Sequence, residues 1–350
     1  MIEATAETTI RVTPCPTCVL CGGEGEIIHH HLQDQMFEVP GTWNVKRCTN
    51  RQCLLLWLDP MPMREDLGKA YARYYTHVSS GRVGNPGMLQ QIVKALKREY
   101  LTAGYNYKFG STSSLMPFGE RLLQMFPLWR AEADGEVRFL KAVPRGRLLD
   151  VGCGSGDWLV SMRELGWEVT GVDFDENAAR VGRQKGLTVN CGALEQQKFA
   201  SDSFDAVTLN HVIEHVPDPV GTLRECIRIL KPGGQLVVFT PNGLSLGHQI
   251  YKEHWRGLEP PRHLHIFSRQ SLHRALGLSG FSEITVLPWL ASSIVYESHL
   301  LRRGWRGSFA GAHPRWLGCA IARVFISVEL MLVRWQPSTS DCVAAIAVKS

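Results

Sequence analysis

The fold is decided by the stretch Leu148-Leu149-Asp150-Val151-Gly152-Cys153-Gly154-Ser155-Gly156. Its apolar residues are typical of a central parallel strand, and its three glycines let the backbone turn sharply and approach a ligand closely. A helical pattern follows at residues 157–165. Strand, glycine loop and helix in this order predict a site for a nucleotide-like cofactor.

The spacing of the glycines separates this loop from a dinucleotide-binding loop, which has the pattern G-x-G-x-x-G. Here the pattern is G-x-G-x-G, and Asp150 comes two residues before the first glycine. A carboxylate at that place would accept a hydrogen bond from an ammonium or amide group and would repel a pyrophosphate. The loop therefore favours a cofactor with a zwitterionic amino-acid part over a nicotinamide dinucleotide.

Further strands are predicted at residues 167–173, 187–190, 204–209 and 235–239, with a helix at 220–230 and a turn at 231–234. This alternation implies right-handed crossovers and a parallel sheet. Asp173 ends the second strand and is the candidate acceptor for ribose hydroxyl groups. Two last strands are expected near residues 284–287 and 342–349.

Residues 147–240 resemble a class I S-adenosylmethionine-dependent methyltransferase in the glycine loop, in Asp173, in Glu214-His215-Val216-Pro217-Asp218-Pro219 and in Leu230-Lys231-Pro232-Gly233-Gly234. The resemblance implies a Rossmann-like α/β fold whose mostly parallel sheet has an antiparallel last strand. It also implies S-adenosylmethionine as the cofactor. The candidate cofactor contacts are then Asp150, Gly152, Gly154, Gly156, Asp173, Phe174, Ala193, Leu194 and Asn210.

The N-terminal region carries two cysteine pairs, Cys18-x-x-Cys21 and Cys48-x4-Cys53. Two such pairs suit one tetrahedral Zn²⁺ ion, which would be structural because four thiolates leave no open position. Cys15 is an alternative ligand, and free or oxidised thiols are the alternative reading. Residues 1–12 contain no apolar signal run, so we expect a cytoplasmic chain, in which disulfides rarely persist.

Three regions are predicted: a zinc-ribbon-like module at 1–60, a helical linker or lid at 61–140, and the methyltransferase domain at 141–350 with a helical insertion near 288–339. Some class I methyltransferases resemble this arrangement, with an aromatic helix after a cysteine-rich module. By that resemblance Tyr71, Tyr74 and Tyr75 would reach the acceptor. The alternative is that they pack the helix onto the domain.

Methyl transfer from a sulfonium is an in-line displacement, so the enzyme must orient the acceptor and, for a hydroxyl, remove its proton. His215 is the favoured base and His211 the second candidate, although His215 could instead pack the start of a helix. A carbon or amine acceptor would need no dedicated base. The resemblance also makes Arg262, His263 and His265 candidate substrate contacts, with polar members of a packed loop as the equal alternative.

The insertion mixes arginines with tryptophans between residues 300 and 335 and is too short in apolar length to span a bilayer. It predicts a helical cap, a homodimer contact, or peripheral contact with a membrane surface or a lipid-linked acceptor. The net charge of +5 contains no Lys/Arg block, so no nucleic-acid role is indicated.

The leading prediction is methyl transfer, by O-methylation, to a small-molecule, sugar or carrier-linked acceptor. The alternatives are a zinc-ribbon interaction protein with an inactive methyltransferase-like domain and a nicotinamide-dependent oxidoreductase.

Overall fold

The computed structural model describes residues 9–72, 87–109, 119–290, 292–306, 325 and 328–350. The chain divides into two compact units. Unit 1 contains Met1–Tyr75, Asn210–Ile227 and Val238–Ala347, and unit 2 contains Thr76–Leu209, Arg228–Val237 and Val348–Ser350. The expectations for Tyr74, for Tyr75 and for residues 307–324 and 326–327 of the insertion lie outside the described residues.

A seven-stranded sheet has the strand order β12-β13-β10-β9-β6-β7-β8. Its strands are β6 (Arg147–Val151), β7 (Glu168–Asp173), β8 (Thr188–Cys191), β9 (Phe204–Asn210), β10 (Leu230–Pro241), β12 (Glu283–Trp289) and β13 (Cys342–Val348). β6 pairs in parallel with β7 and with β9, and β7 pairs in parallel with β8. The predicted Rossmann-like α/β sheet is confirmed, and the last two strands are neighbours at one edge.

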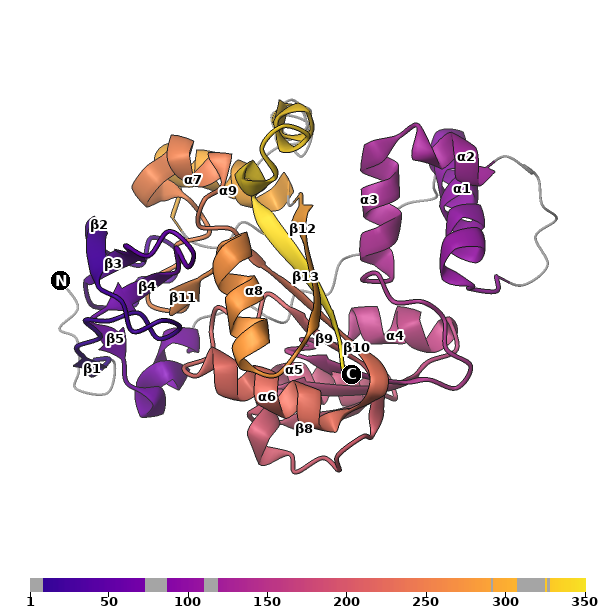
Figure 1. Ribbon diagram of the computed structural model, residues 1–350, viewed down its shortest axis with the longest axis horizontal. Helices are drawn as coiled ribbons and strands as arrows, with labels where there is room; N and C mark the ends of the chain where they lie inside the picture. Colours follow the sequence, from indigo (N-terminus) through magenta and orange to yellow (C-terminus); the bar gives the residue numbers. More distant parts are fainter. Residues whose placement is uncertain (1–8, 73–86, 110–118, 291, 307–324, 326–327) are drawn as a thin grey trace. The chain divides into compact units, whose positions relative to one another are not determined.

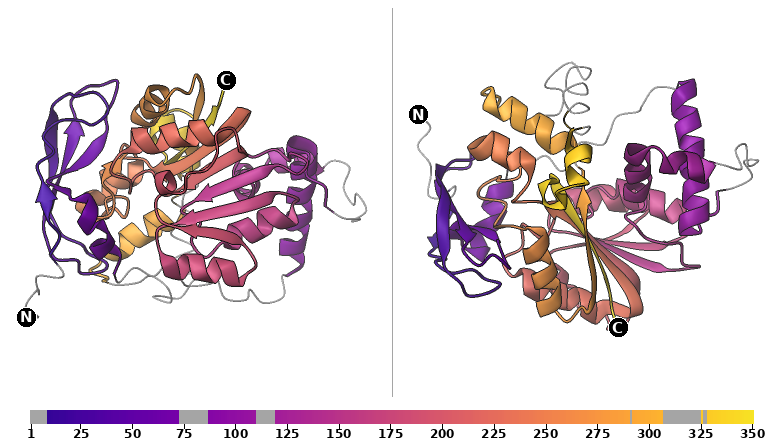
Figure 2. Two further views of the ribbon diagram at one scale, coloured as in Figure 1. Left: turned by 90° about the horizontal axis from the view of Figure 1, so that it is seen from below. Right: turned by 45° about the horizontal axis from the view of Figure 1, so that its top comes forward.

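In unit 2 the parallel strands are joined by α4 (Asp157–Glu164), α5 (Glu176–Gln184) and the short 3₁₀ helix η2 (Leu194–Gln196). Figure 2 shows these strands side by side. Leu148, Leu149 and Val207 are completely buried, as expected for strands covered on both faces. Three helices precede the sheet in the chain: α1 (Met88–Tyr105), α2 (Gly119–Gln124) and α3 (Pro127–Glu136).

The N-terminal part of unit 1 contains a second sheet with the order β11-β4-β3-β2. Its strands are β2 (Gly25–Leu32), β3 (Trp43–Cys48), β4 (Leu56–Asp59) and β11 (His265–Ile266), and all neighbours are antiparallel. β1 (Val12–Thr13) pairs with β5 (Met61–Pro62), and η1 (Arg64–Tyr71) follows. A strand that lies more than 200 residues further along the chain thus completes the sheet of the cysteine-bearing module.

Further helices among the described residues include α6 (Pro219–Ile229), α7 (Leu246–Tyr251), η3 (Lys252–His254), α8 (Arg269–Leu278), α9 (Ser292–Arg302) and η4 (Pro337–Thr339). Figure 1 shows α8 alongside β12. Ser268 caps α8 as its side chain accepts a hydrogen bond from the Ser271 amide. Among the described residues, no helix is long and apolar enough to cross a membrane.

The predicted turn at 231–234 is wrong, because these residues lie within β10. The Gly233 amide donates to the Lys349 carbonyl at 2.8 Å, and the Lys349 amide donates to the Gly234 carbonyl at 3.0 Å. Pairing with the end of the chain therefore holds this Pro-Gly-Gly segment within β10, with Gly233 at a φ of 76°. A tertiary contact overrides the local preference for a turn.

Candidate functional site

The glycine loop in unit 2 takes backbone conformations that favour glycine. Gly152, Gly154 and Gly156 have φ values of 72°, 54° and 75°. A Cβ atom at Gly156 would lie 2.4 Å from Leu187 Cδ1, whereas a Cβ at Gly154 would meet no atom within 4 Å. Gly156 is thus required for packing, and the space beside Gly154 is open to a ligand.

Asp173 lies at the carboxyl end of β7 and is 9% exposed. Its Oδ2 atom accepts a hydrogen bond from the Gly154 amide at 2.7 Å, and its Oδ1 atom accepts one from the Asp175 amide at 2.9 Å. Burial raises the pKa of Asp173, and these two amides oppose that shift. Each oxygen keeps a second lone pair, so the carboxylate can also accept hydrogen bonds from a ribose diol.

Phe174 follows Asp173 and is 63% exposed. The Gly192 amide donates to the Asp173 carbonyl at 2.9 Å, which fixes the start of the 192–194 segment beside Asp173. Ala193 precedes η2, and Leu194 is buried within it. Unit 2 therefore brings the predicted ribose and adenine residues together. Asn210 is the last residue of β9 and belongs to unit 1.

Asp150 is buried and bonded to side chains of unit 2. It forms an ion pair with Arg138, and Thr208 Oγ1 donates to its Oδ1 atom at 2.7 Å. Burial raises the pKa of Asp150, and the charge of Arg138 opposes that shift. The guanidinium of Arg138 also lies over the Trp158 ring, 3.5 Å from its centroid. A direct contact of Asp150 with a cofactor ammonium group stays a prediction.

In unit 1, His211 and Glu214 form a hydrogen-bonded pair in the turn after β9. His211 has a φ of 55°, and its amide donates to the Phe239 carbonyl at 2.9 Å. Its Nδ1 atom lies 3.2 Å from Glu214 Oε1, and its side chain is 38% exposed whereas that of Glu214 is fully buried. The other carboxylate oxygen, Oε2, accepts from Thr240 Oγ1 at 3.0 Å.

Burial by itself would raise the pKa of Glu214, but the hydrogen bond from His211 is the largest of the interactions that oppose this effect, and the pKa is lowered to about 2, so the carboxyl group is ionised at neutral pH. A carboxylate can only accept hydrogen bonds, so it selects the His211 tautomer with the proton on Nδ1. Nε2 of His211 is then the basic nitrogen.

His215 is placed differently from His211. Its Nδ1 atom lies 3.0 Å from the Arg262 carbonyl oxygen and 2.9 Å from the Tyr71 hydroxyl. Its ring packs edge-on against that of His263, with centroids 4.6 Å apart. Burial lowers the pKa of His215. These contacts give His215 a packed position and tie Tyr71 to the same group.

Arg262, His263 and His265 are buried within unit 1. Both terminal nitrogens of Arg262 lie 2.8 Å from Asp34 carboxylate oxygens, and its Nε lies 2.7 Å from Glu259 Oε1. Burial lowers the pKa of each histidine to about 4. The three residues support the loop in this structure, and a contact with acceptor stays a prediction.

Known proteins support the family assignment. Residues 124–286 match the family model described as a methyltransferase domain. The chain carries a class I S-adenosylmethionine-dependent methyltransferase domain. Strands β6 to β10, the glycine loop and Asp173 lie within the matched residues.

Relatives of the methyltransferase domain include a demethylmenaquinone methyltransferase of Listeria monocytogenes, 35% identical over 144 residues, which are 38% of this chain and 60% of the relative. A ubiquinone biosynthesis O-methyltransferase of Xanthomonas oryzae is 43% identical over 103 residues, 27% of this chain and 43% of the relative. A solved S-adenosylmethionine-dependent methyltransferase of Mesorhizobium loti is 20% identical, with a TM-score of 0.45, over 62% of this chain and 97% of its own. The chain thus spans less than two thirds of the length of either curated relative.

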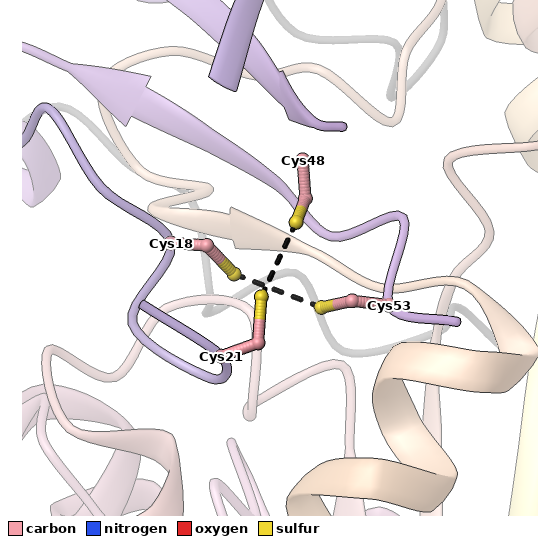
Figure 3. Close-up of side chains that lie close together, drawn as sticks. All are labelled: Cys18, Cys21, Cys48 and Cys53. Carbon is pink, nitrogen blue, oxygen red and sulfur yellow. Dashed lines mark hydrogen bonds between the residues drawn. The ribbon is translucent and has the colours of Figure 1, made fainter. Parts of the chain in front are cut away.

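Outside the methyltransferase domain, unit 1 brings the four predicted cysteines together (Figure 3). Cys18 Sγ lies 3.6 Å from Cys53 Sγ, and Cys21 Sγ lies 3.4 Å from Cys48 Sγ. All four sulfur atoms lie within 4.8 Å of one another. Four thiolates around Zn²⁺ at about 2.3 Å would be about 3.8 Å apart, which is close to this arrangement. Cys15 is not part of the cluster.

The loops that carry the cysteines are held by short backbone hydrogen bonds and by α8. The Gly22 amide donates to the Cys18 carbonyl at 2.8 Å, and the Cys53 amide donates to the Asn50 carbonyl at 2.9 Å. Ser268 Oγ donates to the Cys53 carbonyl at 3.0 Å. The cluster therefore fits a zinc ion and is compatible with a structural metal site.

Sequence reasoning missed Arg138, Asp34 and the role of Glu214. Arg138 lies outside any motif, twelve residues before the carboxylate that it pairs with, and has a φ of 48°. Asp34 pairs with Arg262 across 228 positions of the chain. Glu214 had a usable signal, because an acid three residues after a histidine can reach its ring within one turn.

Proposed function

We propose that this protein transfers a methyl group from S-adenosylmethionine to a hydroxyl group of a small-molecule, sugar or carrier-linked acceptor. The His211–Glu214 pair supports oxygen as the acceptor atom, because it is an exposed imidazole oriented by a buried carboxylate and could accept the proton of a hydroxyl group. One relative's name specifies an O-methyltransferase, which supports the same acceptor atom.

The cofactor is supported by the loop and by Asp173. The open space beside Gly154 and the free lone pairs of the Asp173 carboxylate fit a methionine backbone and a ribose. The exposed ring of Phe174 suits contact with the nucleoside. When bound, S-adenosylmethionine would supply an electrophilic methyl group on a sulfonium.

The proposed base is His211, not the favoured candidate from the sequence, His215. His211 comes two residues after Leu209, in the turn that follows the carboxyl end of β9, and ligands of open α/β sheets bind at the carboxyl ends of the strands. Nε2 of His211 takes the proton of the acceptor hydroxyl as the oxygen gains the methyl group. Glu214 positions the ring and stabilises the imidazolium that forms.

Zinc is a further part of the proposal. A Zn²⁺ ion held by Cys18, Cys21, Cys48 and Cys53 would be structural, because the four sulfur atoms fill a tetrahedral shell. The ion would stabilise the loops at the base of β3 and β4, which are bonded to the N-terminus of α8 through Ser268.

The experiment is transfer of labelled methyl from S-adenosylmethionine into fractionated lysate, with His211→Asn, Glu214→Gln and the exposed control His273→Asn. We expect His211→Asn to lower the rate by about 10²–10⁴-fold with S-adenosylhomocysteine affinity unchanged. The loss should shrink as pH rises, since hydroxide replaces the base. Equal rates for His211→Asn and His273→Asn would refute the role of the base.

The competing function is an interaction protein with an inactive domain. It would be favoured if purified protein transferred no methyl group and bound no S-adenosylhomocysteine in a titration. Binding without transfer to any fraction would instead indicate that the acceptor was missing from the lysate.

A further inference from the structure

A cavity in unit 2 is left unused by the proposed methyl transfer. It has a volume of about 520 Å³ and is lined by residues of α1 and α4 together with residues 108–109 and 136–137. Its size falls in the range of about 300–1,000 Å³ that is typical of sites for small molecules. All of its lining residues belong to unit 2.

One side of the cavity is cationic. Lys94, Lys97, Arg98 and Leu101 line it from α1 at the spacing i, i+3, i+4 and i+7, which puts them on one helix face. Lys97 is already compensated, because its Nζ lies 2.9 Å from Glu132 and 2.8 Å from Glu136.

Lys94, Arg98 and Lys108 are the uncompensated cations of the lining. Within the part of the chain that the structure describes, no ion pair with a carboxylate is recorded for any of the three. Glu136 and Glu164 are the acids of the lining, and Glu136 is the one that pairs with Lys97. The cavity therefore has an excess of positive charge.

The other side is aromatic and apolar, with Phe109, Trp158, Leu101 and Val137. Trp158 is fixed, because its Nε1 donates to the Glu136 carbonyl at 2.9 Å and its ring face contacts the guanidinium of Arg138. The Arg98 guanidinium lies 5.5 Å from the centroid of the Phe109 ring. Flat apolar surface thus adjoins three cations.

We propose that this cavity binds an organic phosphate. Its phosphate or diphosphate group contacts Lys94, Arg98 and Lys108, because lysines attract phosphate as point charges and arginine can bind it with two nitrogens. Its aromatic or alkyl body packs on Trp158 and Phe109. The inference goes beyond the proposed methyl transfer, and its test does not require any transfer of methyl groups.

A ligand in the cavity would also be connected to the cofactor region through the side chains of Trp158, Arg138 and Asp150. Trp158 contacts Arg138, and Arg138 pairs with Asp150 in front of the glycine loop.

The test is isothermal titration of the full-length protein at low ionic strength with UDP, octyl phosphate, inorganic pyrophosphate and uncharged uridine. Excess S-adenosylhomocysteine is present so that the cofactor pocket does not take the probe. Lys94→Glu/Lys108→Glu is compared with Lys141→Glu/Arg180→Glu, which makes the same change of net charge at exposed positions of unit 2.

We expect UDP or octyl phosphate to bind at least ten-fold more tightly than pyrophosphate, and uridine not to bind. The cavity pair should weaken binding at least ten-fold and the control pair less than two-fold. Tighter UDP would identify a nucleotide and tighter octyl phosphate a lipid. Equal weakening by both pairs, pyrophosphate as tight as either probe, or no binding of either probe would overturn the proposal.

Discussion

Replacing Asp34 with alanine should remove the main support of a buried charge. Asp34 accepts two hydrogen bonds at 2.8 Å from the guanidinium of Arg262, and both side chains are at most 1% exposed. It also accepts from the backbone amides of Met36 at 3.0 Å and Phe37 at 3.2 Å. Asp34→Ala therefore leaves a buried cation that still forms an ion pair with Glu259.

Breaking a buried ion pair by removing one partner costs about 3–5 kcal/mol, because the other charge stays desolvated. Glu259 compensates part of that charge, whereas the amides at residues 36 and 37 lose their acceptor at about 1 kcal/mol each. We expect the free energy of unfolding of unit 1 to fall by about 3–5 kcal/mol. Asp34→Asn, which keeps an acceptor oxygen, should cost less.

The assay is urea unfolding combined with native-state hydrogen exchange, so that the opening of β2–β4 is measured separately from that of unit 2. Glu26→Ala is the control, because the Glu26–Arg47 pair is about half exposed and should contribute about 0–1 kcal/mol. The double variant Asp34→Ala/Arg262→Met should recover part of the loss. A loss below about 1 kcal/mol for Asp34→Ala would refute the account of Arg262 as a buried charge that depends on Asp34.

Three further results are expected. Asp173→Asn should weaken S-adenosylhomocysteine binding by at least ten-fold in a titration, with circular dichroism unchanged, because a charge-assisted hydrogen bond is worth about 1.5–3 kcal/mol; unchanged affinity would remove Asp173 from the ribose site. Cys48→Ser should lower zinc content in metal analysis, whereas Cys15→Ser should leave it intact, and equal zinc in both would exclude the four-sulfur site. Burial raises the pKa of Glu329 to about 9 and that of Asp341 to about 7, so both favour the protonated native state. The unfolding free energy should therefore fall as pH rises from about 4 through 7 towards 9, and Glu329→Gln should flatten that slope in urea titrations; a rise with pH would contradict it.

Local pattern was enough to predict the methyltransferase sheet. Buried parallel strands such as β6 are recognisable in the sequence as runs of apolar residues. The glycines of the loop are recognisable too, because Gly152 and Gly154 have positive φ values that favour glycine. Ser268 is a residue type typical of N-caps, because its hydroxyl replaces a missing backbone acceptor at the start of α8. These features depend on residues close together in the chain.

The other features depend on partners that are distant in the chain. Asp150 was expected to face the cofactor, but the structure pairs it with Arg138 and Thr208. Nothing in the pattern around His265 indicates a strand, because β11 is two residues long and is defined by its pairing with β4. The choice between His211 and His215 likewise depended on which ring is hydrogen-bonded to a buried carboxylate and which packs against Tyr71 and His263, a property of the folded chain.

The pairing of β11 with β4 has a consequence for truncated and chimeric forms of the protein. A truncation that begins at residue 61, where the predicted linker starts, would remove the strand that pairs with β11 and expose the buried edge of residues 264–266. It would also delete Asp34. Grafting the cysteine module onto another methyltransferase would fail for the same reason, since the recipient must supply the fourth strand. The N-terminal module and residues 264–266 therefore form one structural unit and have to be exchanged or deleted together.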